Sequence, residues 1–363
     1  MELNSNKKSL NFMPQIEGLR FVAVLSVVVG HWVSLDFSNN FVFFNVPYAA
    51  GVNLFFVISG FLITAILLKK KEDIREGKTS FLKAIKNFYI KRIIRIFPIY
   101  YLLIAILCIL SYNSIKEYLV YLWTYTLNWY MVAKGTYTGN VTHIWSLAIE
   151  EQFYLIWPFL LFIVPKRWVL GTIIIFILIG IFSKIYFQYY THYWMGVNAA
   201  TTSCFDSLGL GALIAYIQRK RTGAFKPRLY KIYLLISILA YILLFVDPGY
   251  LSPELRGLFS NFGNSVVFFF IVIIAANNGF ARISKSFLEN KVVLYLGSIS
   301  YGIYLYQAYA PDVYFNTGIN QHFPNMKGDA DLFIMLFLTA IIIASASWFL
   351  IERPLLSLKK YFQ

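Results

Sequence analysis

Long apolar runs recur along the whole chain and leave little sequence for a water-soluble fold. Of the 363 residues, 59% are hydrophobic and only 13% are charged, whereas soluble domains carry about 25% charged residues. A helix of about 20 mainly apolar residues crosses a bilayer. The sequence therefore predicts an all-α, polytopic integral membrane protein with about ten transmembrane helices. The predicted spans are 15–35, 51–68, 93–112, 143–164, 168–187, 202–218, 230–246, 258–277, 292–310 and 332–352.

The basic residues are unevenly distributed between the predicted loops. If the N-terminus lies in the cytoplasm, 27 of the 32 Lys and Arg residues fall on the cytoplasmic side. Cytoplasmic loops of membrane proteins are enriched in Lys and Arg, so both termini are expected in the cytoplasm. The net charge of +15 then reflects topology and contact with the lipid bilayer, and nucleic-acid binding is not expected.

The largest predicted cytoplasmic element is a basic loop over 69–95. Ser80 has the character of a helix N-cap, which predicts an amphipathic helix lying on the membrane surface. The aromatic-rich segment 115–132 is interrupted, which favours a re-entrant or interfacial piece. We expect one transmembrane domain over 1–363. Its first span should be retained, because no small-residue cleavage site follows the first apolar run.

The first predicted span carries a cation near its start and a histidine deep inside it. Eleven residues separate Arg20 from His31, which is close to three helical turns, so both side chains share one face about 16 Å apart along the axis. Ionisable groups inside a span are costly and usually functional. His31 is therefore a candidate site residue near the bilayer midplane; the alternative is a hydrogen bond that only joins two helices.

A second group of cations stands at the start of the third predicted span. Arg92 and Arg95 are three residues apart, so they are neighbours on one helix face, at a depth similar to that of Arg20. The guanidinium group is suited to binding phosphate through two hydrogen bonds. The alternative is that these arginines only anchor the end of a helix.

Two adjacent carboxylates, Glu150 and Glu151, interrupt the fourth predicted span. Counted from the outer end of that span, Glu150 lies about 12 Å deep. In an apolar slab of about 30 Å this depth nearly coincides with that of His31. Successive helical residues point about 100° apart, so the two carboxylates cannot face His31 equally, and the spacing does not decide between them.

Other patterns exclude several classes of site. The four histidines lie far apart and the two cysteines lie in apolar runs, so neither a metal site nor a disulfide framework is expected. Small residues over 51–61 favour close helix packing. Tyrosines and a glutamine over 297–307 could line a polar cavity, although packing explains them equally well.

Taken in order, these motifs resemble the acyltransferase-3 family of integral-membrane O-acyltransferases. The resemblance covers nearly the whole chain. Asn53 and Gln307 depart from it, since the family often has Asp and His at these positions. Many relatives also carry a C-terminal hydrolase-like domain, and this chain, which ends at Gln363, is expected to be a membrane-only member. The matching segments are Glu17–His31, Gly51–Phe61, Lys91–Pro98, Trp145–Tyr154, Ser300–Leu305 and Glu352–Pro354.

The resemblance implies transfer of an acyl group, usually acetyl from cytoplasmic acetyl-CoA, to a hydroxyl of a saccharide or glycolipid acceptor. It also implies a multi-pass protein of a bacterial-type cytoplasmic membrane. Arg20, Arg92 and Arg95 are then expected to bind the phosphates of coenzyme A. His31 is expected to act as a general base supported by Glu150. Glu150 is preferred to Glu151 because the family signature places its acid first.

A transporter or flippase of a lipid-linked saccharide is the competing hypothesis. In that case His31 and Glu150 would form a proton relay inside the membrane. Inverted repeats with matching broken helices are typical of such proteins, and the sequence has no evident repeat.

Overall fold

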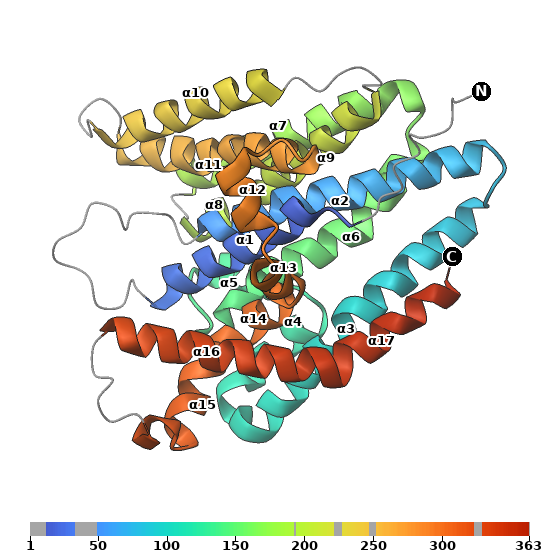
Figure 1. Cartoon of the computed structure of the whole chain (residues 1–363). Helices are drawn as coiled ribbons and strands as arrows, with labels where there is room; N and C mark the ends of the chain where they lie inside the picture. Colours follow the sequence, from blue (N-terminus) through green and yellow to red (C-terminus); the bar gives the residue numbers. More distant parts are fainter. Residues whose placement is uncertain are drawn as a thin grey trace.

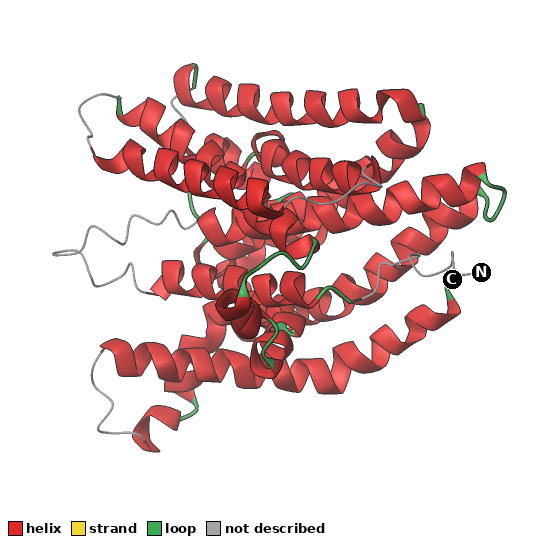
Figure 2. Cartoon of the chain, turned by 45° about the horizontal axis from the view of Figure 1, so that its top comes forward, coloured by secondary structure: helices red, strands yellow, loops and turns green. Residues whose placement is uncertain are grey.

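The computed structural model of the chain is a bundle of helices that run mostly alongside one another (Figures 1 and 2). It describes residues 12–32, 49–191, 194–220, 227–246, 252–322 and 329–362, and these contain no strand. The longer helices are α1 (Pro14–Trp32), α2 (Ala49–Arg75), α3 (Phe81–Ile115), α6 (Trp145–Ile163), α7 (Val169–Tyr189), α9 (Phe205–Lys220), α10 (Pro227–Val246), α11 (Pro253–Ala276) and α16 (Asp329–Ser347). The shorter ones are α4 (Leu119–Trp123), α5 (Leu127–Lys134), α8 (Trp194–Ala199), α12 (Arg282–Leu288), α13 (Lys291–Ser298), α14 (Ser300–Tyr306), α15 (Ala310–Asn316) and α17 (Arg353–Ser357).

Six helical segments in the described part of the chain are long and apolar enough to cross a membrane. They cover the second, third, fourth, fifth, eighth and tenth predicted spans, so the chain is an all-α, multi-pass membrane protein. The total of ten spans and the side on which the termini lie stay predictions. The six segments are 50–75, 81–111, 139–163, 166–189, 257–276 and 330–361.

The ninth predicted span, 292–310, is not one helix. The backbone leaves helical geometry at Ile299 (φ −96°, ψ 7°), so α13 ends at Ser298 and α14 begins at Ser300. Figure 1 shows α13 almost along its axis, while α16 lies across the view. After the break, Tyr304 of α14 meets Ser146 of α6, and Gln307, directly after α14, meets His31 of α1.

The segment predicted as a basic loop, 69–95, is a hairpin of two long helices. α2 continues to Arg75, a short turn contains Gly77 with a positive φ of 71°, and α3 begins at Phe81. Ser80 caps α3 as predicted, because its Oγ accepts a hydrogen bond from the backbone N–H of Lys83 at 3.2 Å. The predicted surface helix is thus the first part of α3. The hairpin turn and the end of α17 lie at the same end of the bundle (Figure 1).

The centre of the bundle is α2, which packs against α1, α6, α9 and α11. Glycines bring its backbone close to that of α9. A Cβ atom on Gly60 would lie 2.0 Å from the carbonyl oxygen of Leu208, and one on Gly211 would lie 2.1 Å from that of Val57. Small residues allow this approach between helices in a membrane. Close packing, as predicted for the segment that contains Gly60, is confirmed.

The interruption predicted within 115–132 is present. A 3₁₀ turn and two short helices, α4 and α5, replace a continuous span. Tyr125, between the two helices, has a positive φ of 52°. Its ring stacks on that of Tyr100 in α3 at a centroid distance of 4.4 Å, so this irregular segment is packed against the bundle.

Candidate active site

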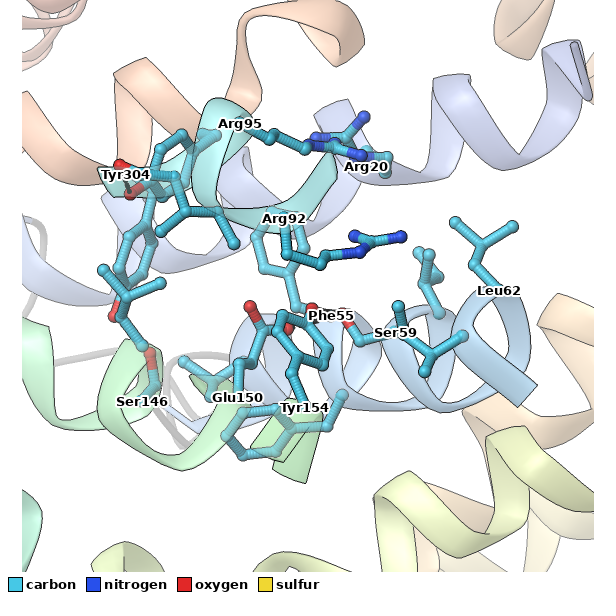
Figure 3. A pocket seen from close by; sticks show the side chains of 17 residues that line it. Arg20, Phe55, Ser59, Leu62, Arg92, Arg95, Ser146, Glu150, Tyr154 and Tyr304 are labelled. Carbon is cyan, nitrogen blue, oxygen red and sulfur yellow. Dashed lines mark hydrogen bonds between the residues drawn. The ribbon is translucent and has the colours of Figure 1, made fainter. Parts of the chain in front are cut away.

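One cavity of about 790 Å³, counting its open part, lies between α1, α2, α3, α6 and α14 (Figure 3). Three arginines line it: Arg20 from α1, and Arg92 and Arg95 from α3. Glu150 of α6 lines it as well. Four of the five site residues predicted from the sequence therefore share one cavity, although their chemical roles stay predictions. We call this cavity the arginine pocket.

The three guanidinium groups gather on one side of the cavity, across from Ser59 and Glu150 (Figure 3). Arg20 is paired with Glu17, one turn earlier in α1, with 3.1 Å between Nη1 and Oε1. Arg92 lies over the ring of Tyr154, 5.3 Å from the ring centroid. Arg95 is within electrostatic range of both other arginines. Because like charges repel strongly where water is scarce, this arrangement favours an anion with several charges.

Carboxylates surround the arginines and balance part of their charge. Besides Glu17 and Glu150, Glu352 lies within electrostatic range of Arg20 and Arg95. Glu352 is buried at the end of the π-helical turn 348–352, and Ser347 donates a hydrogen bond to its Oε1 at 3.4 Å. In the described part of the chain, no group of three His, Cys, Asp or Glu side chains could hold a metal ion.

Glu150 is held in the arginine pocket by Ser59 of α2. The Ser59 hydroxyl donates to Oε1 of Glu150 at 2.5 Å, and the Tyr154 hydroxyl donates to Ser59 at 3.2 Å. Glu151 does not line the pocket, and its Oε1 has no hydrogen-bond partner among the described residues. The structure thus distinguishes the two carboxylates, between which the spacing alone did not decide.

His31 lies outside the residues that line the arginine pocket. Its Nδ1 faces the amide nitrogen of Gln307 at 2.8 Å. The support of His31 by Glu150 stays a prediction; in this structure His31 contacts Gln307, and Glu150 contacts Ser59. The sequence predicted the depths of His31 and Glu150 along their spans, but it did not predict which helices lie next to each other. α14 packs on α1 and also contacts α6.

A row of polar side chains on α14 leads from the arginine pocket to His31. Tyr301 and Tyr304 line the pocket, and Gln307 follows three residues later, about 9 Å along the axis from Tyr301. Ser146 of α6 lies 2.5 Å from the Tyr304 hydroxyl, which donates to the backbone carbonyl of His143. The spacing of three residues between these polar groups was the signal that sequence reasoning did not use. The sequence allowed the tyrosines and the glutamine over 297–307 to line a polar cavity, with packing as the equal alternative, whereas Ser59 and Tyr154 were not predicted as site residues.

A comparison with known protein families finds a match over most of the chain. A family model described as an acyltransferase domain matches residues 13–352. The chain belongs to the acyltransferase-3 family. The motifs that carry the resemblance lie on α1, α2, α3, α6 and α14, the helices that form the arginine pocket. The last motif contains Glu352, beside the arginines.

Two relatives show how far the similarity extends. The peptidoglycan O-acetyltransferase OatA of Listeria monocytogenes is 31% identical over 335 residues, which cover 83% of this chain and 50% of that protein. The O-acetyltransferase OatA of Staphylococcus aureus is 27% identical over 371 residues, which cover 96% of this chain and 58% of that protein. This acyltransferase-3 member therefore spans about half the length of the curated relatives it matches. No solved structure matches it significantly.

Proposed function

We propose that the chain transfers an acyl group, acetyl in the first instance, from acetyl-CoA to a hydroxyl of a sugar or glycan acceptor at the membrane. The observation that carries this proposal is the convergence of Arg20, Arg92 and Arg95 on one cavity in a member of an acyltransferase family. The relatives' names, which refer to O-acetylation, support the acetyl group and the glycan acceptor. Family membership favours acyl transfer over the saccharide transporter.

The arginine pocket fits the donor chemically. Coenzyme A carries several phosphate charges, and guanidinium groups bind phosphate through paired, charge-assisted hydrogen bonds. Arg20 and Arg92 would hold these charges, with Arg95 adding to the field between them. Phe55 and Leu62 provide apolar walls in the same cavity, as the less polar arm of the donor requires.

His31 would act as the general base. It takes the proton of the acceptor hydroxyl as the hydroxyl oxygen attacks the thioester carbonyl carbon. The carbon–sulfur bond then breaks, and His31 returns the proton to the departing thiolate. Gln307 orients the imidazole, the role that the sequence alone assigned to Glu150. Glu150, held by Ser59 among the arginines, instead sets the charge and shape of the donor pocket.

The test uses the purified chain in lipid nanodiscs with acetyl-CoA and a glycan acceptor. Release of free coenzyme A thiol that depends on the acceptor, together with an acetyl-sized mass increase on the glycan, supports the proposal. Movement of a lipid-linked saccharide across the bilayer without thiol release would support the transporter instead. Mass spectrometry of envelope glycans from cells with and without the gene then identifies the natural acceptor.

A further inference from the structure

A second pocket lies where α2 and α9 end and α7 begins. Five cations line it: Lys71 and Arg75 of α2, Lys166 before α7, and Arg219 and Lys220 of α9. Glu72 is the single acid in the lining. This basic pocket has no lining residue in common with the arginine pocket, so the proposed reaction does not account for its charge.

Only some of these cations form ion pairs or hydrogen bonds within the protein. Arg219 forms an ion pair with Glu72, and Lys71 donates to the backbone carbonyls of Leu161, near the end of α6, and of Val164, directly after it. Among the described residues, Arg75 and Lys166 have no carboxylate within ion-pair distance.

Lys220 likewise has no carboxylate partner in the described ranges, and its ammonium lies 5.4 Å over the ring of Tyr216. Three cations thus face one cavity whose single acid, Glu72, is within electrostatic range of Arg75 and Lys166 but is ion-paired with Arg219.

On each of the three helices α2, α7 and α9, an apolar side chain lies about one helical turn deeper in the pocket than a cation. On α2, Leu68 precedes Lys71; on α9, Tyr216 precedes Arg219; and on α7, Val169 follows Lys166. Leu68 and Val169 are buried, and Phe162 of α6 adds a further apolar wall. The pocket therefore has a cationic rim and an apolar interior. It lies at the end of membrane-crossing helices.

We propose that the basic pocket binds one anionic phospholipid. Arg75, Lys166 and Lys220 would hold the headgroup phosphate, and the acyl chains would lie against Leu68 and Phe162. Basic pockets between transmembrane helices recognise anionic headgroups in this way. A free phosphate would use the cations alone and leave the apolar walls exposed, so the two-part lining favours a lipid. The bound lipid would join α2, α7 and α9 at this end of the bundle.

The test compares two pairs of substitutions in the full chain. Lys166→Gln with Lys220→Gln removes two rim charges; both residues are exposed, so the fold is retained. Lys83→Gln with Lys86→Gln removes two exposed charges from the first turns of α3, outside both pockets. Binding of phosphatidylglycerol is followed by native mass spectrometry, with phosphatidylcholine of the same acyl chains, inorganic phosphate and coenzyme A as further probes.

The expected result is saturable binding of one phosphatidylglycerol by the wild type. Each basic residue near an anionic surface contributes about a factor of five to affinity, so the rim pair should weaken binding about 25-fold. The α3 pair should leave it unchanged. Three results would each overturn the proposal. The two variants could lose phosphatidylglycerol affinity equally, the wild type could bind phosphatidylcholine as well as phosphatidylglycerol, or inorganic phosphate or coenzyme A could displace the lipid. None of these outcomes bears on acyl transfer at the arginine pocket.

Discussion

The side chain of Gln307 lies against the imidazole of His31, with 2.8 Å between its amide nitrogen and Nδ1. The amide oxygen of Gln307 is buried and has no hydrogen-bond partner among the described residues. A half-turn of the amide exchanges the two atoms and places the oxygen where a proton on Nδ1 can be donated to it. Nε2 of His31 is then unprotonated and able to act as a base. In that flipped orientation, Gln307 would leave Nε2 of His31 as the nitrogen that accepts a proton.

Replacing Gln307 should slow turnover without weakening donor binding. One hydrogen bond contributes about 1 kcal/mol, so Gln307→Ala should lower kcat about fivefold to tenfold and leave the KM for acetyl-CoA unchanged. Gln307→Glu should restore much of the rate, because a carboxylate accepts from Nδ1 in the same way. A raised donor KM at constant kcat would place Gln307 in the donor site instead.

His31→Ala should reduce the transfer rate about 10²–10⁴-fold, the usual contribution of a general base. The amount of protein in the membrane and its elution on gel filtration should stay at wild-type levels, because His31 is only partly buried. His322, which is exposed in a 3₁₀ turn, offers the matched control, and His322→Ala should keep full activity. Comparable rates in both variants would remove His31 from the mechanism.

Helical periodicity was enough to predict the charged residues that line the arginine pocket. Arg20, Arg92 and Arg95 lie near the same end of their predicted spans, and the depth of such residues follows directly from counting along a span. In a helix bundle, residues at equal depth meet when the helix faces that carry them point toward one another, and these residues line one cavity. The sequence also indicated Ser80 as the start of α3, because capping is a local property.

What the sequence could not predict is which helices are neighbours. Glu150 and His31 have matching depths, but the helix break at Ile299 inserts α14 beside both α1 and α6. Gln307 therefore takes the place expected for Glu150. Likewise, the basic run after Leu68 suggested a loop, whereas long Lys side chains let α2 remain helical into the polar region.

Arg92→Ala should weaken donor binding more than it slows turnover. A charge-assisted hydrogen bond contributes about 1.5–3 kcal/mol, so the KM for acetyl-CoA should rise about 10–100-fold with little change in kcat. Arg167, an exposed arginine outside both pockets, serves as the control, and Arg167→Ala should leave KM unchanged. An unchanged KM for Arg92→Ala would show that Arg92 only anchors α3.

Glu150→Gln should lower both kcat and the KM for acetyl-CoA. The substitution removes a negative charge from a pocket with three guanidinium groups, so phosphate-bearing ligands should bind more tightly and the coenzyme A product should leave more slowly. Steady-state kinetics and direct titration with coenzyme A measure the two effects. A fall in kcat with an unchanged donor KM and unchanged coenzyme A affinity would instead indicate that Glu150 acts together with His31.

Gly297→Ala should destabilise the contact that positions Arg20. A Cβ atom on Gly297 would lie 2.1 Å from the carbonyl oxygen of Glu17, and a backbone atom cannot move aside as a flexible side chain can. We expect a loss of about 1–3 kcal/mol, typical of overpacking, measured as a lower unfolding temperature. The donor KM should also rise, because Glu17 pairs with Arg20. Gly257 of α11 has no atom within 4 Å of the corresponding position, so Gly257→Ala should cause neither loss. Equal losses in the two variants would show that the close contact with Glu17 is not their cause.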